Sequence, residues 1–225
     1  MQYIDYQIYD GIRNMQIDSD ILDNSIITHK KNAVFRLYGW SPACVSLGRN
    51  QNDDFLNKEI MNQYGVDCVR RPTGGRAILH DKEITYSFIV PVELLENGEN
   101  ITKSYIEISG ILIDIFKNLG IELTIGGRER YIKKTNYCMC VSTGADLCFK
   151  GKKFIGSAQY RKSGYILQHG SILLDYNKIM IERIFNTKID FSHIITLNQI
   201  NSDLTVFEII SAVKSYITAH GIEYY

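Results

Sequence analysis

Three stretches of the chain place glycine beside cationic or nucleophilic side chains. They are residues 70–80 (RRPTGGRAILH), residues 151–159 (GKKFIGSAQ) and residues 168–174 (QHGSILL). In the first stretch two adjacent glycines follow a strand pattern, and because they lack Cβ atoms their backbone N–H groups can approach a ligand closely. Such a turn suits an acyl carbonyl or a phosphate. Taken alone, the same stretch also fits an ordinary turn beside a solvated, cationic strand.

The second stretch carries a lysine inside a strand that is otherwise mostly apolar. Lys152 and Lys153 must point to opposite faces of that strand, so one of them faces outward. A lysine that faces inward is costly unless it meets an anion or a polarised oxygen. The functional interpretation is that Lys153 neutralises or polarises a carbonyl or phosphate oxygen. The small residues 156–158 then keep a groove open beside it, although they also fit close packing between strands.

The third stretch contributes His169, which precedes Gly170. An isolated histidine in such a position is more often structural, with a satisfied hydrogen bond, than functional. Cys138 and Cys140 make only one pair of thiols, and no set of histidine, cysteine and carboxylate residues has the spacing of metal ligands. We therefore expect no metal site. The chain also lacks the glycine-rich patterns of nucleotide-binding loops.

Composition limits the classes of protein to which the chain can belong. It has 225 residues, 45% of them hydrophobic, and 25 Lys plus Arg against 25 Asp plus Glu. The balanced charge gives no reason to expect a nucleic-acid or membrane partner, and the chain begins without a secretory signal. Five unevenly spaced cysteines favour reduced thiols and a cytoplasmic protein. Among them, Cys44 and Cys68 lie in apolar strand patterns typical of buried, inert thiols.

Hydrophobic periodicity indicates which elements must position these residues. Strand patterns cover residues 3–9, 33–38, 44–47, 67–71, 77–90, 153–160 and 165–174. Helical patterns cover residues 14–23, 55–64, 102–119, 178–185 and 205–219. Strands mixed with blocks of helices predict one α+β domain over residues 1–225, with mixed, largely antiparallel sheets and flanking helices.

In this order the three stretches resemble the active-site core of the lipoyl/octanoyl transferase and lipoate-protein ligase family, which is related in fold to biotin ligases. The resemblance begins at Asn14 and Met15, continues through residues 39–43 and 46–51, and weakens beyond residue 175. It implies a biotin/lipoyl protein ligase-like catalytic domain with an acyl channel. The substrate-binding positions that it implies are Arg71, Thr73, Gly74, Gly75, His80, Gly156, Ser157, His169 and Gly170.

The family contains ATP-dependent ligases and cysteine-dependent transferases, and several residues here resemble the transferases. Arg76 stands where ligases tend to have a third glycine, and residues 82–87 (KEITYS) are similar to the transferases. Cys138 lies 15 residues before Lys153, which is the spacing of the nucleophilic cysteine in the octanoyltransferases of Gram-positive type. Residues 139–147 depart from that pattern and are partly similar to the ligases. Cys140 therefore remains an alternative nucleophile, and a ligase remains an alternative activity.

The resemblance implies that Cys138 and Lys153 are the catalytic residues of an acyltransferase in protein lipoylation. Cys138 would accept an octanoyl or lipoyl group as a thioester and pass it to a lysine of a carrier domain. The donor would be an acyl carrier protein or another lipoyl-carrier protein. The acceptor would be a lipoyl-domain protein such as the glycine cleavage H protein or a 2-oxoacid dehydrogenase E2. This route requires no cofactor, whereas the ligase alternative requires ATP and Mg; a non-catalytic carrier-binding protein is a third alternative.

Basic residues near both predicted catalytic residues suggest a docking rim for such carriers, which are typically acidic. The predicted rim comprises Arg128, Arg130, Lys133, Lys134, Lys150, Lys152, Arg161 and Lys162. Ordinary solvated loop charges are the alternative for any one of them.

Overall fold

The computed structural model describes residues 1–127, 136–140, 144 and 146–220. The strands are β1 Gln2–Tyr9, β2 Val34–Trp40, β3 Cys44–Leu47, β4 Asp67–Arg70, β5 Ile78–His80, β6 Glu83–Pro91, β7 Thr124–Ile125, β8 Leu147–Phe149, β9 Lys152–Lys162 and β10 Tyr165–Leu173. The helices are α1 Gly11–Ile27, α2 Lys58–Tyr64, α3 Ile101–Asn118, α4 Lys178–Ile184, α5 Leu197–Ile200 and α6 Val206–Ala219. Two short 3₁₀ helices are η1 Val92–Leu94 and η2 Cys138–Cys140.

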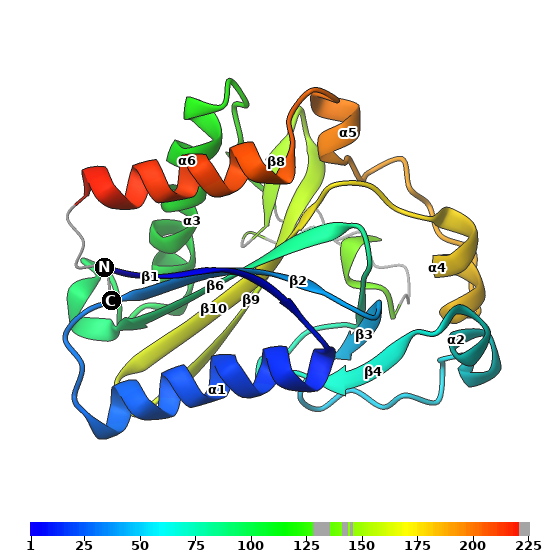
Figure 1. The fold of residues 1–225 in the computed structure, drawn as a ribbon, viewed down its shortest axis with the longest axis horizontal. Coiled ribbons are helices and arrows are strands. Elements are labelled where there is room, and N and C mark those ends of the chain that lie inside the picture. Colours follow the sequence, from blue (N-terminus) through cyan, green and yellow to red (C-terminus); the bar gives the residue numbers. More distant parts are fainter. Residues whose placement is uncertain (128–135, 141–143, 145, 221–225) are drawn as a thin grey trace.

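The strands form a large sheet and a small one (Figure 1). The large sheet has seven strands in the order β1-β2-β6-β10-β9-β8-β7, and the small sheet has three in the order β4-β3-β5. Among the strands of the described residues, β1 pairs with β2 and β3 with β4 in parallel, and the other pairs are antiparallel. This arrangement confirms the predicted α+β class with largely antiparallel sheets.

Local sequence chemistry sets the ends of several helices. The side chain of Asn57 caps α2, and Gly65 ends that helix with a left-handed backbone at φ 64°. Thr205 and Glu208 form the predicted capping box at the start of α6. Helix α1 is longer than the predicted residues 14–23, because Asp10 provides an N-cap four residues earlier by accepting from the Arg13 amide at 2.8 Å.

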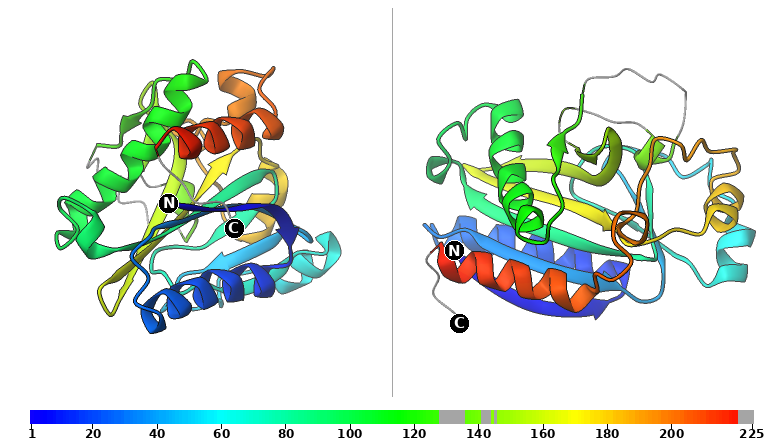
Figure 2. Two further views of the ribbon diagram at one scale, coloured as in Figure 1. Left: turned by 60° about the vertical axis from the view of Figure 1, so that its left-hand side comes forward. Right: turned by 90° about the horizontal axis from the view of Figure 1, so that it is seen from above.

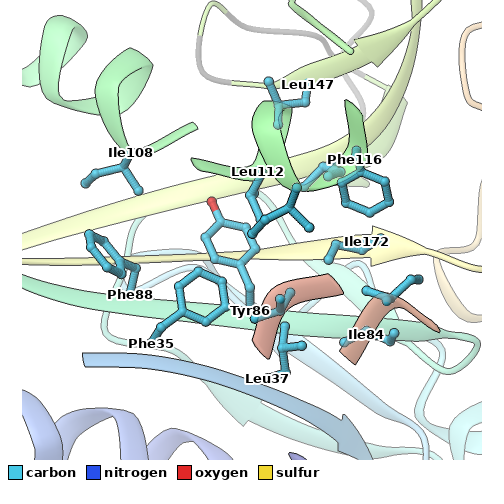
Figure 3. Packing of buried hydrophobic residues seen from close by; sticks show 14 of the residues in the cluster. Phe35, Leu37, Ile84, Tyr86, Phe88, Ile108, Leu112, Phe116, Leu147 and Ile172 are labelled. Carbon is cyan, nitrogen blue, oxygen red and sulfur yellow. The ribbon is translucent and has the colours of Figure 1, made fainter. Parts of the chain in front are cut away.

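One face of the large sheet is apolar and is covered by α3 and α6. Phe35, Tyr86 and Phe88 of β2 and β6 lie in one cluster with Phe116 of α3 (Figure 3). These side chains are at most 2% exposed. Because full burial of one such side chain contributes about 1.5–3 kcal/mol, this cluster supplies much of the driving force that holds both helices on the sheet.

The other face of the same sheet carries polar side chains, and α1 packs on it (Figures 1 and 2). The alternation of side chains along β2 places Phe35 and Leu37 on the apolar face and Arg36 and Tyr38 on the polar face. Asp18 of α1 accepts hydrogen bonds from Arg36 at 2.9 Å and from the Tyr38 hydroxyl at 2.9 Å. A buried ion pair therefore joins α1 to the centre of the sheet.

The structure corrects one expectation about cysteines and adds one strand. Cys44 is buried, as predicted, but Cys68 is exposed, on β4 at one edge of the small sheet. The strand β8 was not predicted, since three residues are too few for a periodic pattern. Within the described residues, no helix combines the length and the apolar composition needed to cross a bilayer.

Candidate active site

A pocket lies between the polar face of the large sheet and the small sheet, which contributes Ser46, Ile78 and His80 to its walls. We call it the inner pocket. Its floor is a row of residues paired across four adjacent strands, namely Tyr38 with Thr85, Thr85 with Ser171, and Ser171 with Gly156. Three strand spacings make the row about 14 Å long.

Cys138 lies at the β9 end of the inner pocket, close to two buried charges. The Lys153 ammonium is 4.0 Å from the Cys138 sulfur and donates to the Cys138 carbonyl oxygen at 3.2 Å. It also forms a 3.0 Å ion pair with Asp146. The Cys138 amide donates to the Ala77 carbonyl at 2.8 Å, which ties the short helix η2 to the small sheet. The two predicted catalytic residues are therefore neighbours in space.

Lys153 is the inward-facing member of its pair, since it is 2% exposed whereas Lys152 is exposed. Burial alone would lower the pKa of Lys153, but the neighbouring Cys138 sulfur and the Asp146 carboxylate outweigh burial, so that pKa is raised. The ammonium therefore remains charged at neutral pH beside the Cys138 sulfur.

Gly156 makes room for that lysine. A Cβ atom at Gly156 would come within 3.0 Å of the Lys153 Cε and within 3.0 Å of the Met139 Sδ. Gly170 is required by a different neighbour, because its Cβ would lie 2.5 Å from the Gly156 carbonyl oxygen. Gly156 therefore leaves space for the Lys153 and Met139 side chains, and Gly170 allows β10 to approach the backbone of β9.

The predicted glycine turn is held by the buried guanidinium of Arg71. Its Nη2 donates to the carbonyl oxygens of Gly74 at 2.7 Å and Arg76 at 2.8 Å. The turn also crosses close to Gly48, where a Cβ atom would collide with the Gly75 carbonyl oxygen. Gly75 has φ +95°, a conformation that favours glycine. These contacts leave Gly74 and Gly75 exposed at the surface of the site.

Thr73 and His169, both predicted to bind substrate, bond to each other. The Thr73 oxygen is 2.7 Å from His169 Nε2, and His169 Nδ1 is 3.3 Å from Asp18 Oδ2. Because Arg71 Nε donates to the Thr73 oxygen at 3.0 Å, the hydroxyl can donate to Nε2, which leaves the Nδ1 proton for Asp18. Burial alone would raise the pKa of Asp18, but the His169 hydrogen bond and the Arg36 charge outweigh it, so that pKa is lowered.

His80 lies in the wall of the inner pocket with its ring stacked on Trp40, at a centroid distance of 3.9 Å. Its Nε2 is 2.8 Å from the Ser46 hydroxyl, and its Nδ1 is 3.2 Å from Glu83 and 3.3 Å from Ser171. Burial lowers the pKa of His80, although Glu83 opposes this effect. The neutral ring is therefore favoured at pH 7.

The Ser157 side chain points away from the floor of the inner pocket, toward the apolar face of the large sheet. Its hydroxyl lies 2.7 Å from the hydroxyl of Tyr86, which accepts from Gln168 at 3.0 Å. Burial raises the pKa of Tyr86 to about 12, so the phenol keeps its proton. The Ser157 amide also donates to Asp146 Oδ1 at 3.4 Å, which helps to orient the partner of Lys153.

A second, more open cavity meets the inner pocket at Cys138, and we call it the outer pocket. Its lining residues are Gly74, Gly75, Arg76, Tyr105, Cys138, Asp146, Lys153, Ser157, Ala158 and Gln159. The Cys138 thiol thus stands between a narrow pocket floored by the sheet and a wider polar one. An acyl chain in the inner pocket would present its carboxyl end to Cys138 and Lys153.

Every predicted site residue except Thr73 lines one of the two pockets, and Thr73 bonds to His169, which does. Their roles stay predictions. Pattern reading missed Asp18 and Asp146, the buried carboxylates that pair with His169 and Lys153. Asp18 follows the quoted Asn14 and Met15, and Asp146 falls inside residues 139–147, so the resemblance had reached both segments. Sequence distance hid the contact between Asp18 and His169, because these residues are 151 positions apart.

The predicted basic rim is only partly described. Arg128, Arg130, Lys133 and Lys134 lie outside the described residues. Lys150 and Lys152 are exposed, and Lys162 pairs with Asp23 at 2.7 Å. Arg161 is half-buried and donates to the Gly98 carbonyl and to Ser104. Its guanidinium therefore holds neighbouring parts of the fold together.

Comparisons with known proteins identify the family. The profile of the lipoyl protein ligase A/B catalytic domain matches residues 10–218. Octanoyltransferase LipM of Carboxydothermus hydrogenoformans is 35% identical over 185 residues, which cover 82% of this chain and 67% of the relative. Octanoyltransferase LipM of Bacillus subtilis is 41% identical over 153 residues, covering 64% of this chain and 55% of the relative. The chain thus spans about two thirds or less of the length of these two relatives.

Solved structures show the same fold at low identity. A putative lipoate protein ligase from Thermoplasma acidophilum with bound lipoic acid has a TM-score of 0.74 at 18% identity, covering 100% of this chain and 87% of that one. Lipoate-protein ligase A bound with ATP also has a TM-score of 0.74, at 17% identity, covering 97% of this chain and 83% of that one. The fold and the sequence match agree, and the chain belongs to the lipoyl protein ligase A/B catalytic domain family.

Proposed function

We propose that this protein transfers an octanoyl group, through a thioester on Cys138, to a lysine of a lipoyl-domain protein. The observation that carries the proposal is the 4.0 Å distance between the Cys138 sulfur and the charged, buried ammonium of Lys153. A thiolate is the nucleophilic form of cysteine, and a nearby cation stabilises it. Cys138 lines both pockets, and Cys140 lines neither. This difference favours Cys138 as the nucleophile.

The first half-reaction moves the acyl group onto the enzyme. The Cys138 thiolate attacks the carbonyl carbon of the donor thioester, and negative charge develops on the carbonyl oxygen. The Lys153 ammonium stabilises that charge in a site where it is already paired and oriented by Asp146. The carbon–sulfur bond of the donor then breaks, and the donor sulfur leaves as a thiolate, which takes up the proton that Cys138 lost on ionising. Cys138 then holds the octanoyl thioester.

The second half-reaction passes the group to the acceptor. The neutral amine of the acceptor lysine attacks the Cys138 thioester through the outer pocket. An amide bond forms as the carbon–sulfur bond breaks, the nitrogen releases one proton to solvent, and the Cys138 thiolate leaves. The donor thioester is already activated, so neither half-reaction requires ATP, a metal or another cofactor. The apolar stretch of the inner pocket retains the acyl chain during the exchange of partners.

Relatives named octanoyltransferase LipM support transfer over the ligase alternative. An acyl carrier protein is the proposed donor, and another lipoyl-carrier protein is the alternative donor. The proposed acceptor is a lipoyl-domain protein such as the glycine cleavage H protein or a 2-oxoacid dehydrogenase E2. A ligase would instead need ATP and Mg to form a lipoyl-adenylate.

The deciding experiment is intact-mass measurement of the protein after mixing with octanoyl acyl carrier protein. The wild type should gain one octanoyl group, and Cys138→Ala should gain none and lose all turnover. Cys68→Ala serves as the matched control, because the Cys68 thiol is exposed and lines neither pocket. This variant should behave as the wild type. An adduct that survives Cys138→Ala and disappears in Cys140→Ala would move the nucleophile to Cys140.

A second measurement separates the two activities. Lipoate-dependent exchange of pyrophosphate into ATP requires an acyl-adenylate, so a transferase cannot support it. Exchange by the wild-type protein, without any octanoyl adduct, would replace the transferase proposal with a ligase.

A further inference from the structure

Three arginines flank the glycine turn, and the structure uses them differently. Arg70 Nη1 donates to the carbonyl oxygens of Gly48 at 2.9 Å and Gln51 at 2.6 Å, so it holds the loop after β3. Arg71 is buried, and its three guanidinium nitrogens all have partners in the turn and in β3. Both side chains are therefore committed to holding backbone in place.

The guanidinium of Arg76 differs from the other two because, in the part of the chain that the structure describes, it does not hold backbone in place. Its side chain is half-buried, and its Nη1 is shielded from solvent with no hydrogen-bond partner among the described residues. A guanidinium N–H that has lost water without gaining an acceptor is unfavourable, and native proteins rarely leave one without a reason. The guanidinium therefore gains from any oxygen atom that a ligand brings to it.

The position of Arg76 limits which ligand can do so. It lines the outer pocket together with Cys138, Lys153 and the exposed Gly74. Among the described residues of that lining, the other two charged groups, Lys153 and Asp146, are paired with each other at 3.0 Å. Arg76 consequently adds a positive charge, which would repel a protonated acceptor lysine and attract carbonyl or phosphate oxygens.

We propose that Arg76 reads the thiol arm of the donor by donating to the amide carbonyl oxygens that follow the thioester in a pantetheine group. This inference rests on the proposed function and extends it to donor recognition. With the acyl chain in the inner pocket and the thioester at Cys138, the arm leaves through the outer pocket past Arg76. A planar guanidinium with several N–H donors suits one carbonyl or two neighbouring ones.

A series of octanoyl donors of increasing length tests this assignment. S-octanoyl ethanethiol has no amide, S-octanoyl-N-acetylcysteamine has one, and S-octanoyl pantetheine has two. The rate of octanoyl adduct formation on the enzyme is measured by intact mass in single-turnover mixing. Arg76→Ala should leave the ethanethiol donor unchanged and should lose on the order of tenfold to hundredfold with pantetheine, as expected for a hydrogen bond from a charged donor.

Arg49→Ala is the matched control, because Arg49 is exposed, lies over the Tyr160 ring and does not line the outer pocket. It removes the same charge and should leave all three donors unchanged. Arg76→Lys keeps the charge but not the planar fork, and should recover only part of the loss.

A direct binding measurement keeps the inference independent of turnover. S-octanoyl pantetheine is titrated calorimetrically into Cys138→Ser and into Cys138→Ser with Arg76→Ala; the second variant should bind on the order of tenfold more weakly. Equal binding would overturn the assignment, as would an equal rate loss with all three donors, or a loss with the intact carrier protein only. Absence of any adduct in the wild type would refute the proposed function, while the binding comparison would still decide the role of Arg76.

Discussion

The two faces of the large sheet are built from the same strands but are held together by different interactions. The face under α3 and α6 is closed by Phe35, Phe88 and Phe116, which interact only by packing. The face under α1 carries Arg36 and His169, whose positions are fixed by hydrogen bonds to Asp18. Alternation along β2 and β6 thus separates the apolar core from the inner pocket by the thickness of one sheet.

This difference has an energetic consequence. The apolar face is stabilised roughly in proportion to buried area, so its residues act nearly independently. The polar face is a connected network in which each buried charge depends on its partner, so the loss of one member leaves another unsatisfied. Substitutions on the first face should change stability alone, and substitutions on the second should change stability, activity or both.

The largest expected effect is on the apolar face. Phe116→Ala removes a fully buried ring that packs edge-on against Phe154, and should lower the free energy of unfolding by about 3–5 kcal/mol. Urea denaturation measures this loss. Ile106→Ala on the same helix is the control, because Ile106 is 44% exposed. If the folded fraction of Phe116→Ala transferred acyl groups more slowly than the wild type, the separation between the faces would fail.

On the polar face, Asp18→Asn should cost about 3 kcal/mol, because it leaves the Arg36 charge buried without its counterion. It should also slow transfer, since His169 loses the carboxylate that fixes its tautomer beside Thr73. Asp23→Asn on the same helix breaks only the exposed pair with Lys162 and should cost less than about 1 kcal/mol. Thermal denaturation and adduct rates measure both effects, and equal costs for the two variants would contradict the network.

Lys153→Ala should lose on the order of 10² to 10³ in rate, as removal of one oxyanion donor does elsewhere. Lys153→Arg should not restore the rate, because a planar fork does not replace a compact ammonium beside Gly156. Lys152→Ala, at the exposed neighbour, is the control. Circular dichroism should show that all three variants are folded. Near-normal transfer by Lys153→Ala would mean that this lysine serves only to neutralise Asp146.

The smallest expected effect is a dependence of stability on pH at His80. Its pKa in the folded protein is lowered by burial, so the unfolded chain binds the proton more readily below about pH 6.5. Stability from this group is present above that pH and is lost as pH falls, by up to about 1.4 kcal/mol per pH unit. His80→Gln should flatten the slope, and the exposed His29→Gln should not. An unchanged slope in His80→Gln would assign the acid sensitivity to other groups.

Much of the fold could be predicted from local patterns. Residues 102–119 have the helical spacing that becomes α3, and residues 165–174 have the apolar run that becomes β10. Errors arose where the deciding contact was nonlocal or the element short. Cys68 looked buried in its strand, yet β4 lies at a sheet edge, and β8 was too short to show a period.

The candidate site divides in the same way. Residue types indicated Lys153 and the glycine turn, because a lysine within a mostly apolar strand and two adjacent glycines both suit an acyl or phosphate oxygen. Cys138 was implied only by the resemblance to the transferases. The carboxylates that complete the site could not be predicted, since Asp146 and Asp18 are two among many acidic residues until the strands pair. The local sequence also does not show that the guanidinium of Arg71 is held by hydrogen bonds whereas that of Arg76, only five positions later, has an unpartnered Nη1 among the described residues.

The sequence by itself determined most of the elements and the family, because these depend on residue identity and short-range periodicity, and the resemblance predicted which residues would carry acyl transfer. The tertiary structure alone decided which side chains meet. Thr73 reaches His169 across 96 positions of sequence, and Lys153 turns inward while Lys152 turns out. The physical reason is strand register: a shift of one residue would move every side chain of a strand to the other face, and register is fixed only when the whole sheet assembles.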